Sequence, residues 1–437
     1  MLWRNIRNAS EAIFAKSSQR IIEGSTLKKK IFEAQEDDDH GALAILLRQL
    51  VDENPDHEDL RSMEIEALRK CHDWTNADSR ALAAIQTRPE SIRLASLYAW
   101  NARLIFDWQE AIFRFAGLRE KFDPKVHLSS AQTVLHEFAC HREMCDEAGA
   151  RNLLADQFDN LLSHAASLYP SRDELVDFAD LVPHQRVSEF LDWLGKESPG
   201  SQNEEYATRV SEGIKNRRWI ESNCPDVRIV SLGQNCLPWI VPNRWGLRPG
   251  AVTLSPFGPF DLLGMANDVV AECLETNFSL LLEPGNLSSI LHPGKIPTLL
   301  ARSGNVSFFH ERGPWWARND WERVHTEYRR RIANFRAGVR SQKRLYIYCI
   351  CSNVNINRII NGYFTHLDHH NSRMLIINVL KENFDINLTC REKIKYAHIP
   401  YPENYNWIAA AEFDSERGSL FEKQIASSIK NELMKFL

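Results

Sequence analysis

The sequence predicts a multidomain protein that combines an all-α region with an α/β domain. Three observations predict this class. Prolines recur at a nearly constant interval through the N-terminal half, apolar runs alternate with helical stretches through the C-terminal half, and a polar stretch bearing Gly, Pro and Ser separates the halves at residues 195–205. We therefore divide the 437 residues into a helical, charged segment (1–37), a helical repeat domain (38–195), a linker with a short helix (196–224) and an α/β domain (225–437).

The repeat domain is predicted from two markers that share one period. Pro55, Pro89 and Pro124 close successive helical segments and lie 34 and 35 residues apart, and the Asp-Trp pairs at 73–74 and 107–108 lie 34 residues apart. That interval is the tetratricopeptide period. Helix pairs of this kind bury their apolar faces only by stacking on their neighbours, and the concave side of the stack usually binds protein or peptide. We expect a tetratricopeptide-like array whose partner is a protein or peptide.

One cluster in this region has the spacing of metal ligands. His136, Cys140, His141 and Cys145 fall at helical spacing and could in principle surround zinc. The same spacing is that of core and surface positions on an amphipathic repeat helix, which is the interpretation we favour. The sequence therefore predicts neither a metal site nor a cofactor.

The C-terminal half alternates strands and helices. Helical stretches are expected at 262–282, 320–341 and 355–370. Continuous apolar strands between helices indicate a mostly parallel, Rossmann-like sheet that is covered on both faces. The chain has no Gly-x-Gly-x-x-Gly, Walker or Gly-x-Ser-x-Gly motif, so dinucleotide, nucleotide and serine-hydrolase sites lack support. The expected strands are 227–232, 306–309, 345–350, 374–379 and 396–399.

The most informative stretch is Val-Arg-Ile-Val-Ser-Leu-Gly-Gln-Asn-Cys at residues 227–236. Gly233 permits a sharp turn after the first strand and presents Cys236 at the start of a helix. A helix N-terminus favours the thiolate and offers backbone N–H groups to an oxyanion. The alternative is a buried, inert cysteine. Pro238 suits the first turn of that helix, whereas Pro242 is expected to end it early.

Several further motifs accompany this cysteine in a fixed order. They resemble a bacterial family described as papain-like cysteine peptidases, over roughly residues 226–410, although Leu262 stands where that family has tryptophan. The resemblance implies a cysteine peptidase, while the strand–helix alternation predicts a parallel sheet rather than the antiparallel sheet of papain. The motifs are Ser-Leu-Gly-Gln-Asn-Cys (231–236), Trp-Gly-Leu-Arg (245–248), Pro-Phe-Asp (259–261), Leu-Glu-Thr-Asn-Phe (274–278), His310 after a strand, Tyr-Arg-Arg-Arg-Ile-Ala-Asn-Phe (328–335) and Asn-Tyr-Asn-Trp (404–407).

A thiol and imidazole pair follows from the expected topology. Ligands bind beyond the carboxyl ends of parallel strands, where both Cys236 and His310 are expected. His310 would act as the general base for the thiol. Asp261 or Asn404 would orient the imidazole, with Asn406 less favoured. Each of these residues also has a structural alternative, since a histidine can end a strand, an aspartate can cap a helix and an asparagine can belong to a turn.

The oxyanion or substrate would be held by Gln234, Asn235 or the backbone N–H of Cys236. Other histidines compete with His310 as the base, and His398 is the strongest competitor because it also lies near a strand end. Cys349 and Cys351 are expected to be packing residues. The remaining competing histidines are His292, His325, His366, His369 and His370.

Composition limits the classes of partner and compartment. The formal charge of −5 argues against a nucleic-acid-binding protein, and the basic run at 329–331 is read as a solvated helix face. No apolar stretch approaches eighteen residues and the N-terminus lacks the apolar segment of a signal peptide, so no membrane span is expected. Nine cysteines, an odd number, suit a reducing compartment. We expect a cytoplasmic location.

The leading hypothesis is a cysteine-dependent hydrolase, either a peptidase or an acyl hydrolase or transferase, joined to a protein-binding array. The alternative is a non-catalytic scaffold or ligand-binding protein. A link to surface-polysaccharide assembly is a further alternative, but the α/β region has no Asp-x-Asp site for a nucleotide sugar.

These hypotheses predict different results for Cys236→Ser. If Cys236 is the nucleophile, the variant loses all turnover and keeps its fold, because serine preserves the shape but not the thiolate. If the protein is a scaffold, the variant shows only a modest change in stability. Turnover of acyl substrates and the thermal midpoint, measured on the native protein and the variant, distinguish the two.

Overall fold

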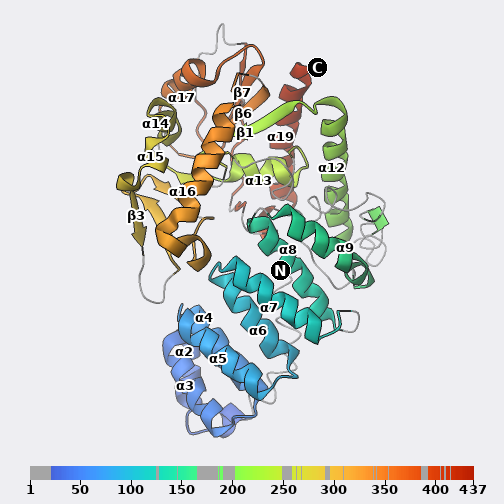
Figure 1. The fold of residues 1–437 in the computed structure, drawn as a ribbon, viewed down its shortest axis with the longest axis vertical. Coiled ribbons are helices and arrows are strands. Elements are labelled where there is room, and N and C mark those ends of the chain that lie inside the picture. The colour runs from blue at the N-terminus through green and yellow to red at the C-terminus, as the bar shows by residue number, and fades with distance from the viewer. Residues whose placement is uncertain are drawn as a thin grey trace.

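The computed structural model describes residues 21–124, 127–144, 146–164, 186, 188–189, 202–248, 258–261, 263–266, 268–290, 296–308, 310–337, 339–340, 342–352, 354–384, 392–403, 405–407, 410–413 and 415–437. It has a helical N-terminal half and a C-terminal half that contains a parallel sheet (Figure 1). The expected division into an all-α region and a region with a parallel sheet is confirmed.

The N-terminal helices form a stack in which each helix packs against the next along the chain. The first helices of three successive pairs, α3, α5 and α7, begin 34 residues apart. The helices are α2 (Lys28–Glu36), α3 (His40–Glu53), α4 (Glu58–Lys70), α5 (Trp74–Thr87), α6 (Ile92–Leu104), α7 (Trp108–Lys121), α8 (Leu128–Glu143) and α9 (Glu147–Ser163).

The 34-residue interval is built into the turns between the pairs. Asp39, Asp73 and Asp107 are the N-cap residues of α3, α5 and α7. The residue before each cap has a positive φ, of 55°, 62° and 62°. Asp39 and Asp73 accept hydrogen bonds from backbone N–H groups of the first turn, as N-cap carboxylates do. Each pair therefore starts with the same left-handed turn and an aspartate at the N-cap, although the Asp107 side chain makes no capping hydrogen bond.

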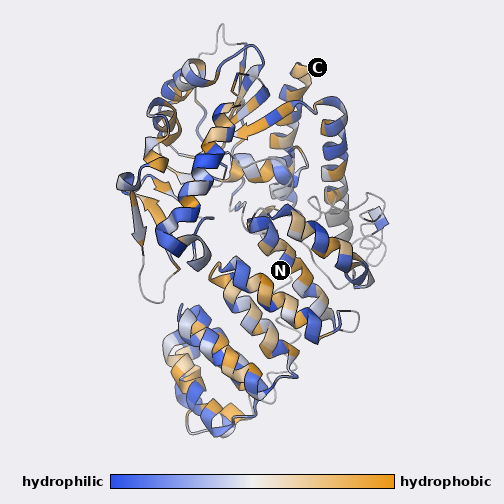
Figure 2. Cartoon of the chain, viewed as in Figure 1, coloured by the Kyte–Doolittle hydropathy of each residue, from blue (hydrophilic) through white to orange (hydrophobic). Residues whose placement is uncertain are grey.

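The C-terminal half is organised around four parallel strands in the order β1-β6-β7-β8. Helices α12, α13 and α19 share an apolar core with one face of this sheet, and α14, α16 and α17 share a core with the other. Because both faces are covered, the strands carry runs of consecutive buried apolar residues, such as 345–350 in β6, and β1 is mostly orange in Figure 2. The elements are α12 (Gln202–Asn223), β1 (Val227–Ser231), α13 (Leu237–Arg244), α14 (Val269–Glu275), α15 (Ser279–Leu282), η2 (Pro284–Asn286), α16 (Pro314–Ala337), β6 (Lys343–Ile350), α17 (Ile356–Gly362), η3 (Tyr363–Leu367), β7 (Ser372–Asn378), β8 (Ile394–His398), α18 (Ala410–Phe413), α19 (Glu416–Leu433) and η4 (Met434–Phe436).

A second, antiparallel sheet was not expected. Its strands are β2 (Gly264–Met265), β3 (Leu287–Ile290), β4 (Thr298–Ala301) and β5 (Val306–Ser307), in the order β2-β5-β4-β3. The strand expected at 306–309 therefore belongs to this sheet and not to the parallel one. The sequence indicated a strand at β5 but none at β2, β3 or β4, because strands of two to four residues are too short to show a clear period of two.

The helix expected at 262–282 was also wrong as a single element. The described part of this range contains β2 and two short helices, α14 and α15. Asn277 and Phe278 separate these helices with φ values of 56° and 66°, a left-handed backbone conformation that interrupts an α-helix. The apolar spacing of the range is that of two helices with a turn between them. Residues 319–321 have positive φ as well, so α16 consists of two helices joined at a kink.

The long helices of the C-terminal half carry charged outer faces. The short helix expected within the linker (196–224) is α12, which is longer than expected and runs from Gln202 to Asn223. Within the residues that the structure describes, no helix combines the length and apolar character needed to cross a membrane.

The array packs directly onto the α/β half. Trp108 and Phe115 of α7 belong to the same apolar cluster as α16 and the parallel sheet. At the rim of this contact, Arg318 lies 3.0 Å from a carboxylate oxygen of Asp107, and the guanidinium of Arg312 lies 4.2 Å from the centre of the Phe106 ring. Figure 1 shows the first turns of α16 facing the array.

The contact between the array and the loop before α16 leaves no room for a side chain at Gly313. A Cβ at Gly313, where φ is 95°, would lie 2.4 Å from the carbonyl oxygen of Ile105 in the array. Gly304 also has a positive φ, of 72°, but a Cβ there would meet nothing within 4 Å. We expect Gly304→Ala to cost about 1 to 2 kcal/mol from the backbone conformation alone. Gly313→Ala should cost about 3 kcal/mol or more, since the array must also move.

Urea denaturation of the two variants and the native protein measures this difference. Equal losses at both glycines would contradict a tight contact between the array and the loop before α16.

Candidate active site

Cys236 lies where β1 passes into α13, as the N-cap residue of that helix. Only 8% of the residue is exposed. The turn needs Gly233 for space, because a Cβ there would lie 2.1 Å from Cγ of Pro238. At its far end α13 is anchored by Arg244, whose guanidinium donates to the buried carboxylate of Glu422 at 2.5 Å. The thiol is therefore held at the start of a fixed helix.

The expectation that Pro242 would end this helix early was wrong. The helix continues through Pro242 to Arg244. The missing N–H of Pro242 would have bonded to the carbonyl of Pro238, at the very start of a helix of eight residues, so only one hydrogen bond of the first turn is lost. The carbonyl of Pro242 accepts a hydrogen bond from the N–H of Leu247 and closes the C-terminal end.

The side chain of Gln234 is bound to the end of β6 and does not serve as an oxyanion donor. Its Oε1 accepts from the N–H of Cys351 at 2.8 Å and of Ser352 at 3.1 Å, and its Nε2 donates to the Ser352 hydroxyl at 2.9 Å. Asn235 accepts from the N–H of Leu237 at 2.9 Å and donates to Sγ of Cys351 at 3.1 Å. Both side chains position the turn that carries Cys236.

His310 faces this thiol from the other sheet. Its Nε2 lies 3.5 Å from Sγ of Cys236. The histidine follows β5 and is held by its neighbours. The Phe308 ring packs edge-on against Tyr328, and the buried Glu311 pairs with Arg331 at 2.7 Å. Both contacts are to α16, so the long helix sets the position of the imidazole.

The opposite side of the imidazole faces the helical array. Nδ1 of His310 lies 3.9 Å from Oε2 of Glu143, the last residue of α8. This is the distance of an ion pair rather than of a direct hydrogen bond. Cys236, His310 and Glu143 thus form a line of thiol, imidazole and carboxylate. Sequence reasoning missed Glu143, because nothing in the repeat pattern marks it as different from other helix-end glutamates.

The charges of His310 and Glu143 stabilise each other. Burial alone would lower the pKa of His310, but its contacts with Cys236 and Glu143 outweigh burial and raise that pKa to about 10. Burial would raise the pKa of Glu143, but the neighbouring His310 outweighs it and lowers that pKa below the usual 4.5. At neutral pH the imidazole is therefore protonated and the carboxylate ionised.

Asp261, one of the residues expected to orient His310, pairs with an arginine instead. Asp261 is buried and paired with the guanidinium of Arg248 at 3.2 and 3.3 Å, and it also accepts from the N–H of Gly258. Asn404 lies outside the described residues. His398 was the strongest competing base, and its Nε2 lies 2.9 Å from the carbonyl oxygen of Leu380. Among the carboxylates of the described chain, Glu143 is the one that pairs with His310.

A second thiol lies near the site. Sγ of Cys351, at the end of β6, is 3.1 Å from Nδ2 of Asn235 and 3.7 Å from the hydroxyl of Tyr401. The contact with Cys349 lowers the pKa of Cys351 and outweighs burial, which would raise that pKa. Both cysteines pack as expected, since Cys349 belongs to the buried apolar cluster beneath α13 and α19 and Cys351 packs against it. Burial raises the pKa of Cys349.

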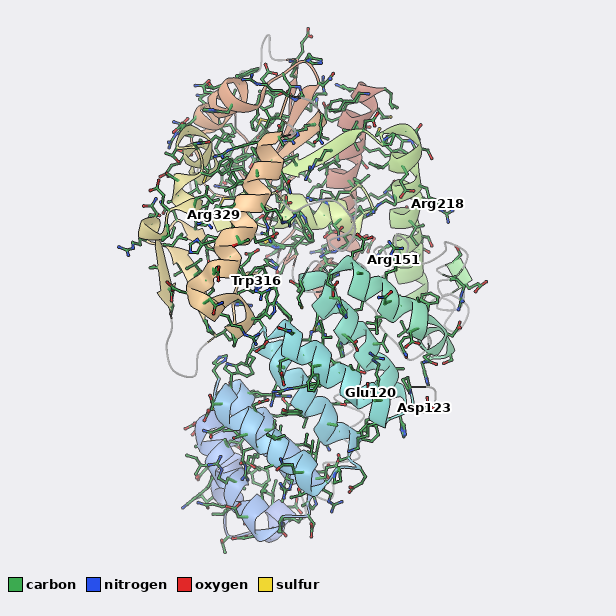
Figure 3. The ribbon with its side chains drawn as sticks, in the orientation of Figure 1. Glu120, Asp123, Arg151, Arg218, Trp316 and Arg329 are labelled. Carbon is green, nitrogen blue, oxygen red and sulfur yellow. The ribbon has the colours of Figure 1, made fainter. Side chains whose placement is uncertain are left out.

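A cavity of about 370 Å³ lies between the end of α8 and α16. Met144, which follows Glu143, forms one wall. The Trp316 side chain is buried, and its Nε1–H has no hydrogen-bond partner in the described chain. Figure 3 shows Trp316 at the end of α16 nearer to the array. The lining is completed by Trp315, Arg318, Asn319, Glu322, Arg323, Thr326 and Glu327.

The possible zinc ligands of α8 have other partners. His136 lies 2.6 Å from the guanidinium of Arg103, and Nδ1 of His141 lies 2.8 Å from Asp146. Cys145 lies outside the described residues. Across the described ranges, no group of three or more His, Cys, Asp or Glu side chains is arranged to hold a metal ion.

Comparison with known proteins adds no relative. No protein-family model, no curated protein and no solved structure matches the chain. The resemblance to cysteine peptidases therefore stays a prediction, and the functional argument depends on the site itself.

Glu143 is expected to control the protonation of His310. In Glu143→Gln the shape is kept but the negative charge is lost, so the pKa of His310 should fall from about 10 toward the ordinary value near 6.5. Glu120→Gln, an exposed change on α7 (Figure 3), is the matched control. Titration of the His310 ring by NMR measures both variants, and an unchanged pKa in Glu143→Gln would contradict the assignment.

The same raised pKa gives stability a definite dependence on pH. Since the folded pKa of His310 lies above its unfolded value near 6.5, the stabilisation is complete below pH 6.5 and is lost as pH rises through about 10. Denaturation midpoints across that range should fall more for the native protein than for His310→Ala.

Proposed function

We propose that this protein is a cysteine-dependent hydrolase or acyltransferase in which Cys236 is the nucleophile, His310 its acid–base partner and Glu143 the residue that orients the imidazole. One observation carries the proposal: Nε2 of His310 lies 3.5 Å from the thiol while Nδ1 faces a carboxylate at 3.9 Å. A nucleophile, a base within reach and a third group that orients the base are the parts required for covalent acyl transfer.

The electrostatics support a thiolate and imidazolium pair. A pKa of about 10 keeps His310 protonated at neutral pH, and a cation beside a cysteine at a helix N-terminus favours the thiolate. In the first half-reaction the sulfur attacks an acyl carbon and His310 gives its Nε2 proton to the leaving group. In the second half-reaction His310 accepts a proton from water or an acceptor alcohol or amine, which attacks the thioester and releases Cys236.

The developing oxyanion needs hydrogen-bond donors close to the sulfur. Because the side chain of Gln234 is bound to β6, we assign this role to the backbone N–H of Cys236, at the start of α13. The N-terminal end of a helix carries partial positive charge, which favours the oxyanion further.

We assign the substrate to the cavity between α8 and α16. Its walls are provided by the same two elements that hold the imidazole, since Met144 follows Glu143 and Glu327 pairs with Arg331, the partner of Glu311. Trp315 and Trp316 in its lining suit an apolar or planar group. An acyl chain or peptide fits this chemistry.

The helical array has two roles in this proposal. Its 34-residue period and capped helix pairs support a tetratricopeptide-like array that binds protein or peptide. It also supplies Glu143, so we propose that the Rossmann-like α/β half is not a complete enzyme without the array. A partner bound to the array can act on the site through α8.

The reactivity of individual cysteines tests the proposal. We expect Cys236 to be alkylated below about pH 7, where an ordinary thiol with a pKa near 8.5 is largely unreactive. His310→Ala should slow the reaction at pH 6 by about tenfold or more, and Glu143→Gln by a smaller factor. Cys71→Ala, which removes an exposed cysteine at the end of α4, is the matched control and should leave the reactivity of Cys236 unchanged. Mass spectrometry of each alkylated cysteine over a pH series provides the rates.

Two outcomes would contradict the proposal that Cys236 is a catalytic nucleophile. The first is that Cys236 is protected from alkylation at every pH, and the second is that its alkylation follows the pH dependence of a free thiol in both the native protein and His310→Ala. Either result supports the non-catalytic scaffold instead.

A further inference from the structure

Three arginines surround a small space at the other end of the parallel sheet. Arg228 and Arg344 are direct neighbours in the register of β1 and β6, and Arg248 lies beside them. Directly opposed like charges on adjacent strands repel each other. Asp261 is the one carboxylate among the residues that line this space, and it is already paired with Arg248.

Arg344 is the residue whose charge is least compensated. It is 0% exposed. Its guanidinium donates to two neutral oxygens, the carbonyl of Phe335 at 2.7 Å and Oε1 of Gln342 at 3.3 Å. Within the described ranges it has no carboxylate partner. A fully buried cation without a counter-charge is strongly unfavourable, so folded proteins pair such groups with an anion.

The orphaned donors of this cluster line one cavity. The Nε–H groups of Arg248 and Arg344 are buried and have no acceptor in the described part of the chain. Both residues line a cavity of about 10 Å³, which is the space of a single water-sized atom. The remaining lining is contributed by Arg228, Ile229, Val230, Gly258, Asp261 and Phe335. Cationic donors around such a space select a negatively charged atom over water.

The segment that follows Arg248 in the sequence carries no negative side chain. Residues 249–257, which connect Arg248 to Gly258, are Pro-Gly-Ala-Val-Thr-Leu-Ser-Pro-Phe and contain no acidic side chain. The repulsion is also reflected in Arg228, whose pKa is lowered by burial and then by the nearby Arg344 and Arg248.

We propose that Arg344, Arg248 and Arg228 form a binding site for a small inorganic anion. The cavity has room for one oxygen of a phosphate or sulfate, whereas a chloride ion, which is larger than a water molecule, requires the arginine side chains to move apart. The anion would accept the Nε–H groups of Arg248 and Arg344 and neutralise the buried charge of Arg344. Guanidinium groups bind such anions through charge-assisted hydrogen bonds.

This site is separate from the proposed active site. Arg228 and Arg344 are the second residues of β1 and β6, whereas Cys236 lies beyond the carboxyl end of β1. Neutralising charge between the two strands would stabilise the β1–β6 pair that leads to the thiol. The anion is therefore a structural ligand of the sheet, and its binding does not depend on catalysis.

Salt titrations of the intact protein test the proposal. In a low-salt buffer, chloride, phosphate and sulfate are each added to the native protein, and the thermal midpoint is recorded. We expect a saturable rise with at least one of these anions, since a ligand that binds only the folded state stabilises it in proportion to its occupancy. Line broadening in chloride NMR, with phosphate as competitor, measures binding directly and identifies which anion is preferred.

Variants separate specific binding from a general salt effect. Arg344→Met should abolish the saturable rise, and Arg228→Gln should weaken the apparent affinity by about tenfold while keeping the two buried donors, as expected for about 1.4 kcal/mol of lost attraction. Arg329→Gln, on the exposed surface of α16 (Figure 3), is the matched control and should respond like the native protein. If native protein, Arg228→Gln and Arg329→Gln all respond equally and without saturation, the site does not exist.

Discussion

The packing of the helical array against α16 is the contact on which the rest of the structure depends. One continuous apolar cluster includes Trp108 and Phe115 of α7, Trp316 of α16 and strands of the parallel sheet. This cluster fixes the end of α8 relative to the loop after β5. The contact of Glu143 with His310 and the cavity beside it exist only because these two surfaces are held together.

Buried ion pairs hold the elements that carry the site. Arg331 fixes Glu311 next to His310, and Arg244 fixes α13 through Glu422. Such pairs contribute little net stability, but removing one partner leaves a buried charge and is costly. They therefore select one arrangement of α13 and α16 over others. The same principle makes Arg344 conspicuous, because it is buried like these arginines but has only neutral partners in the described chain.

Much of the fold followed from local patterns. The 34-residue interval predicted helix pairs, and the apolar runs located β1, β6, β7 and β8 to within a few residues. The second sheet escaped because its strands are short and pair across turns that carry no periodic pattern. Cys236 and His310 were found as candidates because each follows an apolar strand, which is a local feature of the chain. The carboxylate of the site was missed because Asp261 matched the motif order while Arg248 had already captured its charge.

The sequence by itself determined the helical period, the apolar strands and a thiol at the start of a helix, since these depend on residues close together in the chain. The tertiary structure decided which carboxylate faces His310, where Gln234 directs its amide and which arginines share a cavity. Those outcomes depend on distances between segments far apart in the sequence and on competition between charges for a limited number of partners. A local sequence pattern contains neither these distances nor this competition. The role of Glu143 therefore follows only from the tertiary structure, in which the end of α8 lies next to the loop after β5.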